Sequence, residues 1–451
     1  MRRLVISSFF WIAPLSAIHA QSFLIVPANP VLAGDSISIR LEGLPANADV
    51  KLVAERVVSQ SWMPGAKPVL YRSEAVFAVG ADGKLDTATA KPKSGSYKGA
   101  DKHGLFWSMN PTKDDAADRK TSDVKLIAFA GDKPLAEARI EFINRLPAVK
   151  TEKVDRFPGA VFANIPGETK RPAIIVLGGS EGGSWVAREF APMLASRGFA
   201  VLGLPYYSPV QFPATKPEIP ELPASFADIP VERLNDAYEW LKTRPEVDAT
   251  RIALHGTSKG AEFALIGGSE FSWIKAIVAP VPTDVVWEGW GNDVAPGTKS
   301  SFSLNGKPLP FVPYVDFAQE FTGFQTGNEV KVRRPQDKGR AANPLAAVKA
   351  RIPVEKFKGP LLIIGGQDDQ VWASGMMAHN IAERRAEHGL ETVALIYPDA
   401  GHGLTGNGYQ PTTQSNAGPM KMGGTPEGNG RAMGDAFPKT IAFLQRVLGV
   451  R

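Results

Sequence analysis

The chain has 451 residues, of which 43% are hydrophobic and 22% are charged, and its formal net charge is +5. This composition is typical of a soluble globular protein with more than one domain, and the small, dispersed positive charge gives no reason to expect nucleic-acid binding. The absence of cysteine excludes disulfides, a thiolate nucleophile and a thiolate metal site.

The first 20 residues have the pattern of a secretory signal peptide. Arg2 and Arg3 precede an apolar run, and small residues end at Ala20. The run contains Pro14 and is too short for a comfortable membrane span, so we expect cleavage after Ala20. Loss of the two arginines would lower the net charge from +5 to +3. We therefore expect a periplasmic or secreted protein whose mature form has no membrane segment.

Residues 22–150 contain short runs in which apolar and polar residues alternate. Examples are SISIRLEGL, DVKLVAERVV, AVFAVGADGKLDTATA and VKLIAFAGDKPLAEARIEFI. Glycine, proline, asparagine and aspartate separate these runs, which is typical of a small antiparallel β-sandwich. The stretch NRLPAVKTEKV, near residue 150, is predicted to be a linker.

Residues 155–451 follow a different rhythm, in which apolar strands alternate with glycine-rich turns and helices. This rhythm predicts a mostly parallel sheet with helices on both faces. The predicted strands are 173–179, 199–206, 251–256, 275–280, 360–369 and 392–402, and a clear amphipathic helix is predicted over 230–245. Two irregular segments, 284–357 and 403–430, interrupt the rhythm, and we expect them to form walls of a pocket, the first as a lid-like insertion.

A candidate nucleophile follows the strand 251–256. In LHGTSKGAEFAL, Ser258 lies two residues from Gly256 and two from Gly260. This spacing is common on its own, and a small polar residue in a tight turn is the alternative interpretation. The strand before the serine and the helix after it favour a nucleophile elbow, in which the backbone N–H of Lys259 faces a developing oxyanion.

A serine nucleophile needs a base and an orienting carboxylate, which follow it in the order acid, histidine. Asp368 and Asp369 come after the strand at 360–367, and we expect Asp368 to be the acid and Asp369 to cap the next helix. His402 follows the last predicted strand and has a glycine on each side. His379 and His388 fall within a helical stretch and are predicted to be surface or packing residues.

The stretch LGGSEGG (177–183) follows one strand and precedes a helix, so its backbone N–H groups are free to bind an anion. It matches neither G-x-G-x-x-G nor the P-loop. We therefore expect the region of Ser180 and Glu181 to supply a second oxyanion donor. The histidines are scattered, and no metal site or cofactor is predicted.

Several of these motifs resemble one family, the acyl-CoA thioesterase and bile acid-CoA:amino acid N-acyltransferase family. GTSKGAEFAL is similar to its G-x-S-K-G-x-E elbow, GGQDDQVWAS to its acid loop and YPDAGHG to its histidine loop. The similarity runs from about residue 25 to the C-terminus and includes GSYKGADKHGLFWSMNP (95–111) and GGTPEGNGRAMGDAFPKTIAFL. The resemblance implies an α/β-hydrolase fold preceded by an immunoglobulin-like β-sandwich domain, with Ser258, Asp368 and His402 as the triad.

The resemblance also implies an activity. We expect a serine hydrolase of acyl thioesters that works through an acyl-enzyme, with a small-molecule acyl thioester or ester as its partner. The family's amino-acid-conjugating branch has cysteine at the elbow, so the serine favours hydrolysis over N-acyl transfer. The alternatives are an exported carboxylesterase or dienelactone-hydrolase-like enzyme, an acyl-CoA:amino acid N-acyltransferase and a catalytically silent binding protein.

Overall fold

The computed structural model describes residues 22–26, 29–59, 67–114, 116, 123–211 and 214–450. The segment predicted to be a signal peptide, residues 1–20, lies outside the described residues. Among the helices that are described, none is both long and apolar enough to cross a bilayer.

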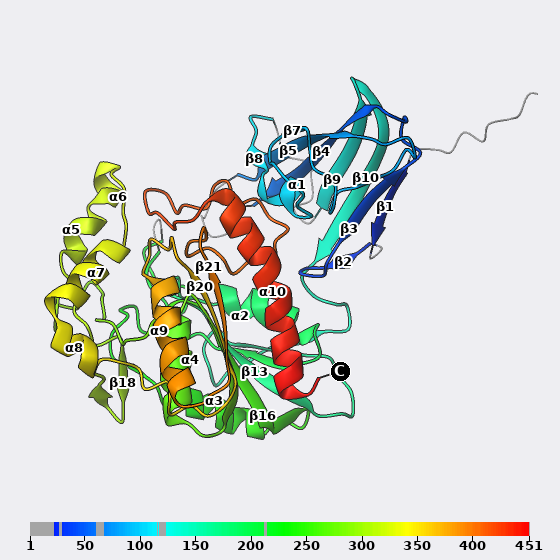
Figure 1. The fold of residues 1–451 in the computed structure, drawn as a ribbon. Coiled ribbons are helices and arrows are strands. Elements are labelled where there is room, and N and C mark those ends of the chain that lie inside the picture. The colour runs from blue at the N-terminus through cyan, green and yellow to red at the C-terminus, as the bar shows by residue number, and fades with distance from the viewer. Residues whose placement is uncertain are drawn as a thin grey trace, which may run out of the picture.

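The N-terminal part of the chain forms two β-sheets (Figure 1). The smaller sheet has the order β1 (Ser22–Val26), β3 (Ser38–Glu42), β6 (Leu85–Asp86). The larger sheet has the order β2 (Val31–Leu32), β10 (Lys133–Ile143), β9 (Asp123–Ala130), β4 (Asp49–Val58), β5 (Val69–Ala78), β7 (Ser94–Gly95), with β8 (Asn110–Pro111) also paired to β5. The short helix α1 (Gly104–Trp107) lies in the connection between β7 and β8.

The two sheets enclose one hydrophobic core, as a β-sandwich requires. Alternate side chains of β4 (Val50, Leu52 and Ala54) point into this core together with Ile39 and Leu41 of β3. The side-chain period of two along a strand explains why the alternating runs in the sequence predicted this arrangement.

The rest of the chain is built around an eight-stranded sheet. Its order is β11 (Lys150–Lys153), β12 (Val161–Asn164), β14 (Ala200–Gly203), β13 (Arg171–Leu177), β16 (Val247–Gly256), β17 (Ile274–Pro280), β20 (Leu361–Gly366), β21 (Thr392–Tyr397). Strand β12 is antiparallel to both of its neighbours, whereas all the other adjacent pairs are parallel. Strand β11 falls within the predicted linker, which is therefore partly a strand of this sheet.

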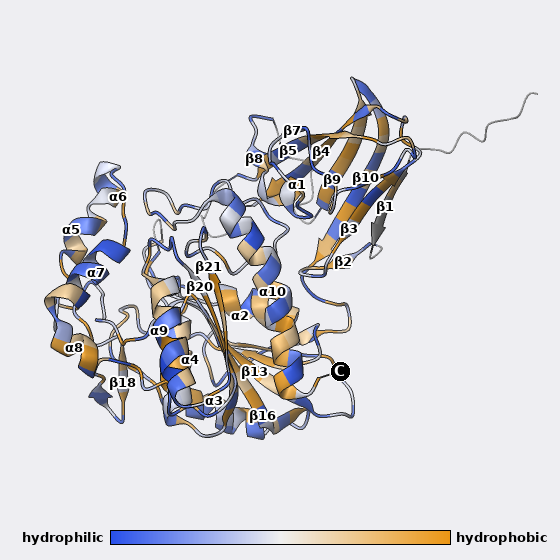
Figure 2. Ribbon diagram, in the orientation of Figure 1, coloured by the Kyte–Doolittle hydropathy of each residue, from blue (hydrophilic) through white to orange (hydrophobic). Residues whose placement is uncertain are grey.

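Five helices cover the two faces of this sheet (Figure 1). On one face lie α2 (Trp185–Ala195) and α10 (Pro426–Leu448), and on the other lie α3 (Arg233–Lys242), α4 (Lys259–Glu270) and α9 (Ser374–Glu387). Figure 2 shows the hydrophobic residues concentrated along the central strands. This strand order, with helices on both faces, confirms the predicted α/β-hydrolase fold.

The irregular segment 284–357 is an ordered insertion between β17 and β20. It contains β18 (Phe302–Leu304) and β19 (Lys307–Pro308), which form a small sheet with β15 (Ile229–Pro230). Four helices follow: α5 (Phe317–Phe321), α6 (Gly323–Thr326), α7 (Arg333–Ala342) and α8 (Pro344–Lys349). The insertion lies beside α9 and α4, at the outer edge of the molecule (Figure 1).

The register of the parallel strands brings their carboxyl ends to one edge of the sheet. Leu177 is opposite Gly256, Pro280 is opposite Ile364, and Gly366 is opposite Tyr397. The loops that leave these strands therefore meet, and the candidate residues of the sequence lie on them.

Candidate active site

Ser258 occupies a sharp turn between β16 and α4. Its φ of 57° and ψ of −118° are unusual for a residue with a side chain. A Cβ added to Gly256 would lie 2.0 Å from the carbonyl oxygen of Gly260, and a Cβ added to Gly260 would lie 2.4 Å from that of Gly178. The flanking glycines are therefore required by close backbone contacts, and the turn has the strand–turn–helix form of a nucleophile elbow.

The imidazole of His402 connects this serine to a carboxylate. His402 Nε2 lies 2.9 Å from Ser258 Oγ, and His402 Nδ1 lies 2.8 Å from Asp369 Oδ2. All three residues are buried. Side chains in this order can pass the serine proton to the imidazole while the carboxylate fixes its tautomer.

The acid predicted from the sequence, Asp368, is wrong by one residue. Asp368 is exposed, and its carboxylate accepts hydrogen bonds from the Gly424 N–H (2.9 Å) and from Gln370 Nε2 (2.7 Å). Asp368 lies in the turn that follows β20, whereas Asp369 forms a bridge to Gly423, and the two side chains point in different directions. Asp369 is the one that faces the histidine.

Asp369 does not cap α9 as the sequence predicted, because the N-cap of that helix is Ala373, with no side-chain cap hydrogen bond. The Asp369 carboxylate instead stabilises the loop before the helix. Its Oδ1 accepts the backbone N–H groups of Val371 (2.9 Å) and Trp372 (3.2 Å), and its Oδ2 accepts the hydroxyl of Ser374 (2.6 Å). The same carboxylate therefore organises its own loop and holds His402.

The loop after β21 positions His402. The His402 N–H donates to the Met422 carbonyl oxygen at 2.8 Å, and the ring of Trp372 meets the imidazole edge to face at 5.6 Å between centroids. His379 and His388, at α9, are exposed and take no part in the site.

The glycine-rich loop after β13 approaches the serine through Gly179. A Cβ added to Gly179 would lie 3.1 Å from Ser258 Cβ, whereas Ser180 is exposed. The Gly179 N–H donates to Glu181 Oε1 at 2.8 Å. Gly179 is the residue that sequence reasoning missed, and the need for glycine at a close approach is the signal that could have identified it.

Lys259 is the first residue of α4, so its backbone N–H has no acceptor within the helix. Of the three residues predicted to supply oxyanion donors, Lys259 therefore has a backbone N–H beside Ser258 that is free to bind an oxyanion. Glu181 instead places its carboxylate on the backbone N–H of Gly179.

The charge environment of the site is shaped by burial. The Glu181 residue as a whole is exposed, but its carboxyl group turns back onto Gly179. Desolvation raises the pKa of this carboxyl group, and the hydrogen bond from the Gly179 N–H and the charge of His402 oppose that rise. Burial lowers the pKa of His255, three residues before Ser258, to about 4, so this imidazole is neutral at neutral pH.

A small, mainly apolar cavity lies on the α2 and α10 face of the sheet. It has a volume of about 20 Å³ and is lined by residues that include His255, Phe190, Leu404 and Phe437. This volume is suited to about one water molecule, so it is too small for an acyl chain. Residues 404–406 line this cavity, which is not a substrate pocket, so the predicted role of 403–430 as a pocket wall stays a prediction.

Comparison with known proteins gives a consistent family. A model described as the acyl-CoA thioester hydrolase/BAAT N-terminal region matches residues 34–156, and one described as the BAAT/acyl-CoA thioester hydrolase C terminal matches residues 229–450. The chain is 30% identical to mitochondrial acyl-coenzyme A thioesterase 2 of Mus musculus, over 92% of this chain and 87% of that protein. It is 29% identical to acyl-coenzyme A thioesterase 1 of Rattus norvegicus, over 94% and 96% of the two chains.

Among solved structures, the chain is similar to a putative dienelactone hydrolase from Klebsiella pneumoniae, with 14% identity and a TM-score of 0.40 over 66% of this chain and 99% of that chain. The sequence relatives extend over both the sandwich and the α/β-hydrolase sheet. The chain belongs to the acyl-CoA thioester hydrolase/BAAT family.

Proposed function

We propose that the protein hydrolyses acyl thioesters in two steps, with Ser258 as nucleophile, His402 as general base and Asp369 as the residue that orients the imidazole. One observation carries the proposal: a single buried imidazole lies within 2.9 Å of the serine hydroxyl and 2.8 Å of a buried carboxylate. Family membership makes the chain a hydrolase of thioester or ester bonds. A serine at the elbow of a chain without cysteine favours water over an amine as the acceptor.

In the first step, Ser258 Oγ adds to the carbonyl carbon of the substrate and its proton moves to His402 Nε2. The tetrahedral intermediate then expels the thiolate, which takes the proton from the imidazolium. In the second step, His402 removes a proton from water as the water oxygen adds to the acyl-serine carbonyl. The second tetrahedral intermediate then breaks its bond to Ser258 Oγ, which takes the proton back from the imidazolium as the carboxylic acid leaves. Asp369 stabilises the imidazolium in both steps.

The oxyanion that forms in each step needs hydrogen-bond donors. We assign this role to the backbone N–H groups of Gly179 and Lys259, because both lie beside Ser258. Removing one such donor typically lowers kcat by about 10²–10³-fold. Glu181 must turn away from the Gly179 N–H when substrate binds, because its carboxylate occupies that donor in the free protein.

The test measures how fast the purified mature protein hydrolyses acyl-CoA thioesters and p-nitrophenyl esters. The Ser258→Ala variant is assayed in parallel. We expect Ser258→Ala to lower kcat by about 10⁴-fold or more, because a serine hydrolase retains little catalysis without its nucleophile. It should keep the wild-type Tm and should not react with a fluorophosphonate probe. Near-native turnover by Ser258→Ala would exclude the proposed nucleophile.

A second candidate function is hydrolysis of oxygen esters outside the cytoplasm. The N-terminal pattern of two arginines, an apolar run and small residues supports export, which would separate the protein from cytoplasmic CoA. Pairs of substrates with the same acyl group, one a thioester and one an oxygen ester, distinguish the candidates by their kcat/KM. A consistent preference for the oxygen ester would favour the second function.

A further inference from the structure

The first turn of α4 contains a buried lysine and a buried glutamate whose side chains have no part in the proposed reaction. The side chains of Lys259 and Glu262 are 3% and 0% exposed, and Lys259 Nζ forms an ion pair with Glu262 Oε2. Desolvation lowers the pKa of Lys259 and raises that of Glu262, while each partner's charge opposes the shift of the other.

The ammonium group of Lys259 lies among three aromatic rings. Its Nζ is 4.9 Å from the ring centroid of Phe226 and 5.4 Å from those of Trp290 and Phe302. It also donates to Ser301 Oγ at 2.7 Å. Cation–π attraction and this hydrogen bond therefore fix the whole side chain, and three of these four partners belong to the insertion.

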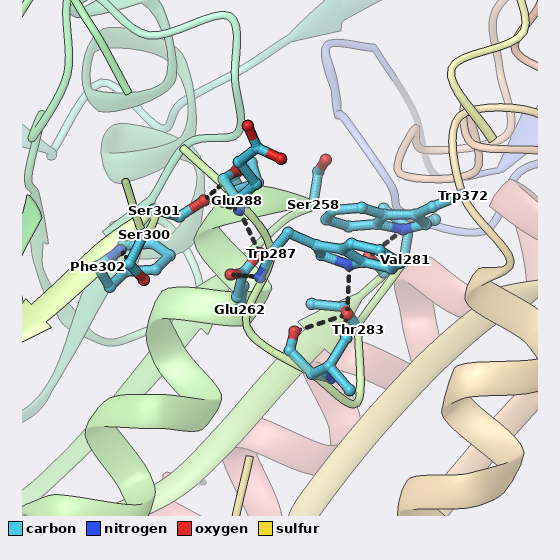
Figure 3. Close-up of polar contacts among 12 residues, drawn as sticks. Ser258, Glu262, Val281, Thr283, Trp287, Glu288, Ser300, Ser301, Phe302 and Trp372 are labelled. Atoms are coloured by element: carbon cyan, nitrogen blue, oxygen red, sulfur yellow. Dashed lines mark hydrogen bonds and ion pairs between the residues drawn. The ribbon is translucent and has the colours of Figure 1, made fainter. Parts of the chain in front are cut away.

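Glu262 binds the same insertion at a second point. Its Oε1 accepts the backbone N–H of Trp287 at 3.0 Å, and Ser301, which binds Lys259, donates to the Glu288 carbonyl oxygen at 3.0 Å. Figure 3 shows both contacts to the left of Ser258. The first turn of α4 is thus tied to both ends of the segment 287–302.

Stability alone does not account for this pair. The cost of removing two charges from water commonly offsets their attraction, and apolar replacements of similar volume are often as stable. The position of the pair is more informative. Lys259 directly follows Ser258, whose backbone is strained, and its own N–H stands at the free end of α4.

We propose that Lys259 and Glu262 are positioning residues: by tying the first turn of α4 to residues 287–302, they hold the Lys259 backbone N–H where the oxyanion forms. This inference rests on the proposed function. Preorganised donors stabilise the transition state because they are fixed before the reaction begins. A more mobile donor therefore weakens binding of the transition state more than binding of the substrate.

The test uses the full chain with Lys259→Met, and the double variant Lys259→Met/Glu262→Gln. The double variant keeps the side-chain volumes and an acceptor for the Trp287 N–H, so it avoids leaving an unpaired buried charge. We expect its kcat for a p-nitrophenyl ester to fall about 10–100-fold while KM changes less than about 3-fold. Inhibition by an alkyl trifluoromethyl ketone, which forms a tetrahedral adduct with serine, should weaken by the same factor as kcat.

Arg197→Met is the matched control, because it removes another ion pair, with Asp35, at the domain junction. Arg197→Met should lower Tm without weakening inhibition by the trifluoromethyl ketone. A double variant with wild-type kcat and inhibition would overturn the positioning role, even if its Tm fell. If the positioning role fails in this way, the proposed function still stands as long as the wild type is active and Ser258→Ala is inactive. An inactive wild type would overturn both the positioning role and the proposed function.

Discussion

At the scale of single residues, the Asp369 carboxylate has the most partners in the site. It lies beneath the surface, completely buried, and its two oxygens are shared between His402, a serine hydroxyl and two backbone N–H groups. Because Asp369 Oδ2 accepts a hydrogen bond from His402 Nδ1, the proton of the neutral imidazole is held on Nδ1, and Nε2 is left free to accept the serine proton.

The adjacent aspartates provide a matched pair of variants. Asp369→Asn should lower kcat by about 10⁴-fold, because an amide no longer selects the tautomer that accepts the serine proton. Asp368→Asn should change kcat less than about 3-fold, since its amide oxygen can still accept the Gly424 N–H. Steady-state kinetics with one ester, and a Tm for each variant, check this. An equal loss in both variants would contradict the assignment of Asp369.

At the scale of elements, the elbow depends on the contact of α4 with the end of β13. The first helical residues of α4 pass so close to β13 that a Cβ on Gly260 would lie 2.4 Å from the carbonyl oxygen of Gly178 and 2.6 Å from that of Leu177. These are backbone atoms of a central strand and its turn, and they cannot move without disturbing the site.

Gly260→Ala should therefore destabilise the protein, although alanine is intrinsically better than glycine in a helix by about 1 kcal/mol. We expect a loss of about 2–3 kcal/mol or more, together with most of the activity. Gly267→Ala, in the same helix, is the control, because its Cβ would meet only side-chain atoms such as Leu234 Cδ1. Thermal denaturation compares them. A Gly260→Ala variant as stable as Gly267→Ala would mean that the elbow tolerates a side chain.

The elements that the sequence predicted well are those with a strong hydrophobic pattern. Strands β13, β17 and β20 are buried on both faces, so they read as continuous apolar runs. Strand β11 lies within the predicted linker, because all four of its residues, Lys150–Lys153, are exposed at the sheet edge and give no apolar pattern. The helices α5 and α8 have no buried residue, so they lack the apolar spacing that identifies a helix.

The active-site residues that the sequence predicted correctly are likewise those that lie in a clear sequence pattern. Ser258 and His402 could be located because each follows a predicted strand and has glycines around it. The choice between Asp368 and Asp369 depends on which side of the loop each faces, and no periodicity records that direction. Gly179 was missed because its role depends on a contact with Ser258, which is distant in the sequence.

At the scale of the whole molecule, the loop that carries His402 continues into the N-terminal sandwich. Tyr409, seven residues after His402, is buried in the sandwich core, where its ring lies 5.0 Å from that of Phe106 and 5.5 Å from that of Phe142. Its hydroxyl accepts the Ile37 N–H at 2.8 Å. Figure 1 shows the start of α10 next to α1 of the sandwich, where the two helices are in contact.

The sandwich therefore anchors the histidine loop, and Tyr409 is the residue through which this can be tested. Tyr409→Phe should lower the free energy of unfolding by about 1–3 kcal/mol, because the buried Ile37 N–H loses its acceptor. Tyr409→Ala should cost about 3–5 kcal/mol, because it also leaves a cavity between aromatic rings. Since the freed loop begins at His402, Tyr409→Ala should lower kcat as well, whereas Tyr409→Phe should keep it near the wild-type value. Calorimetry and ester hydrolysis on the same samples measure both effects, and a Tyr409→Ala variant with wild-type Tm and kcat would show that the active site does not depend on the sandwich.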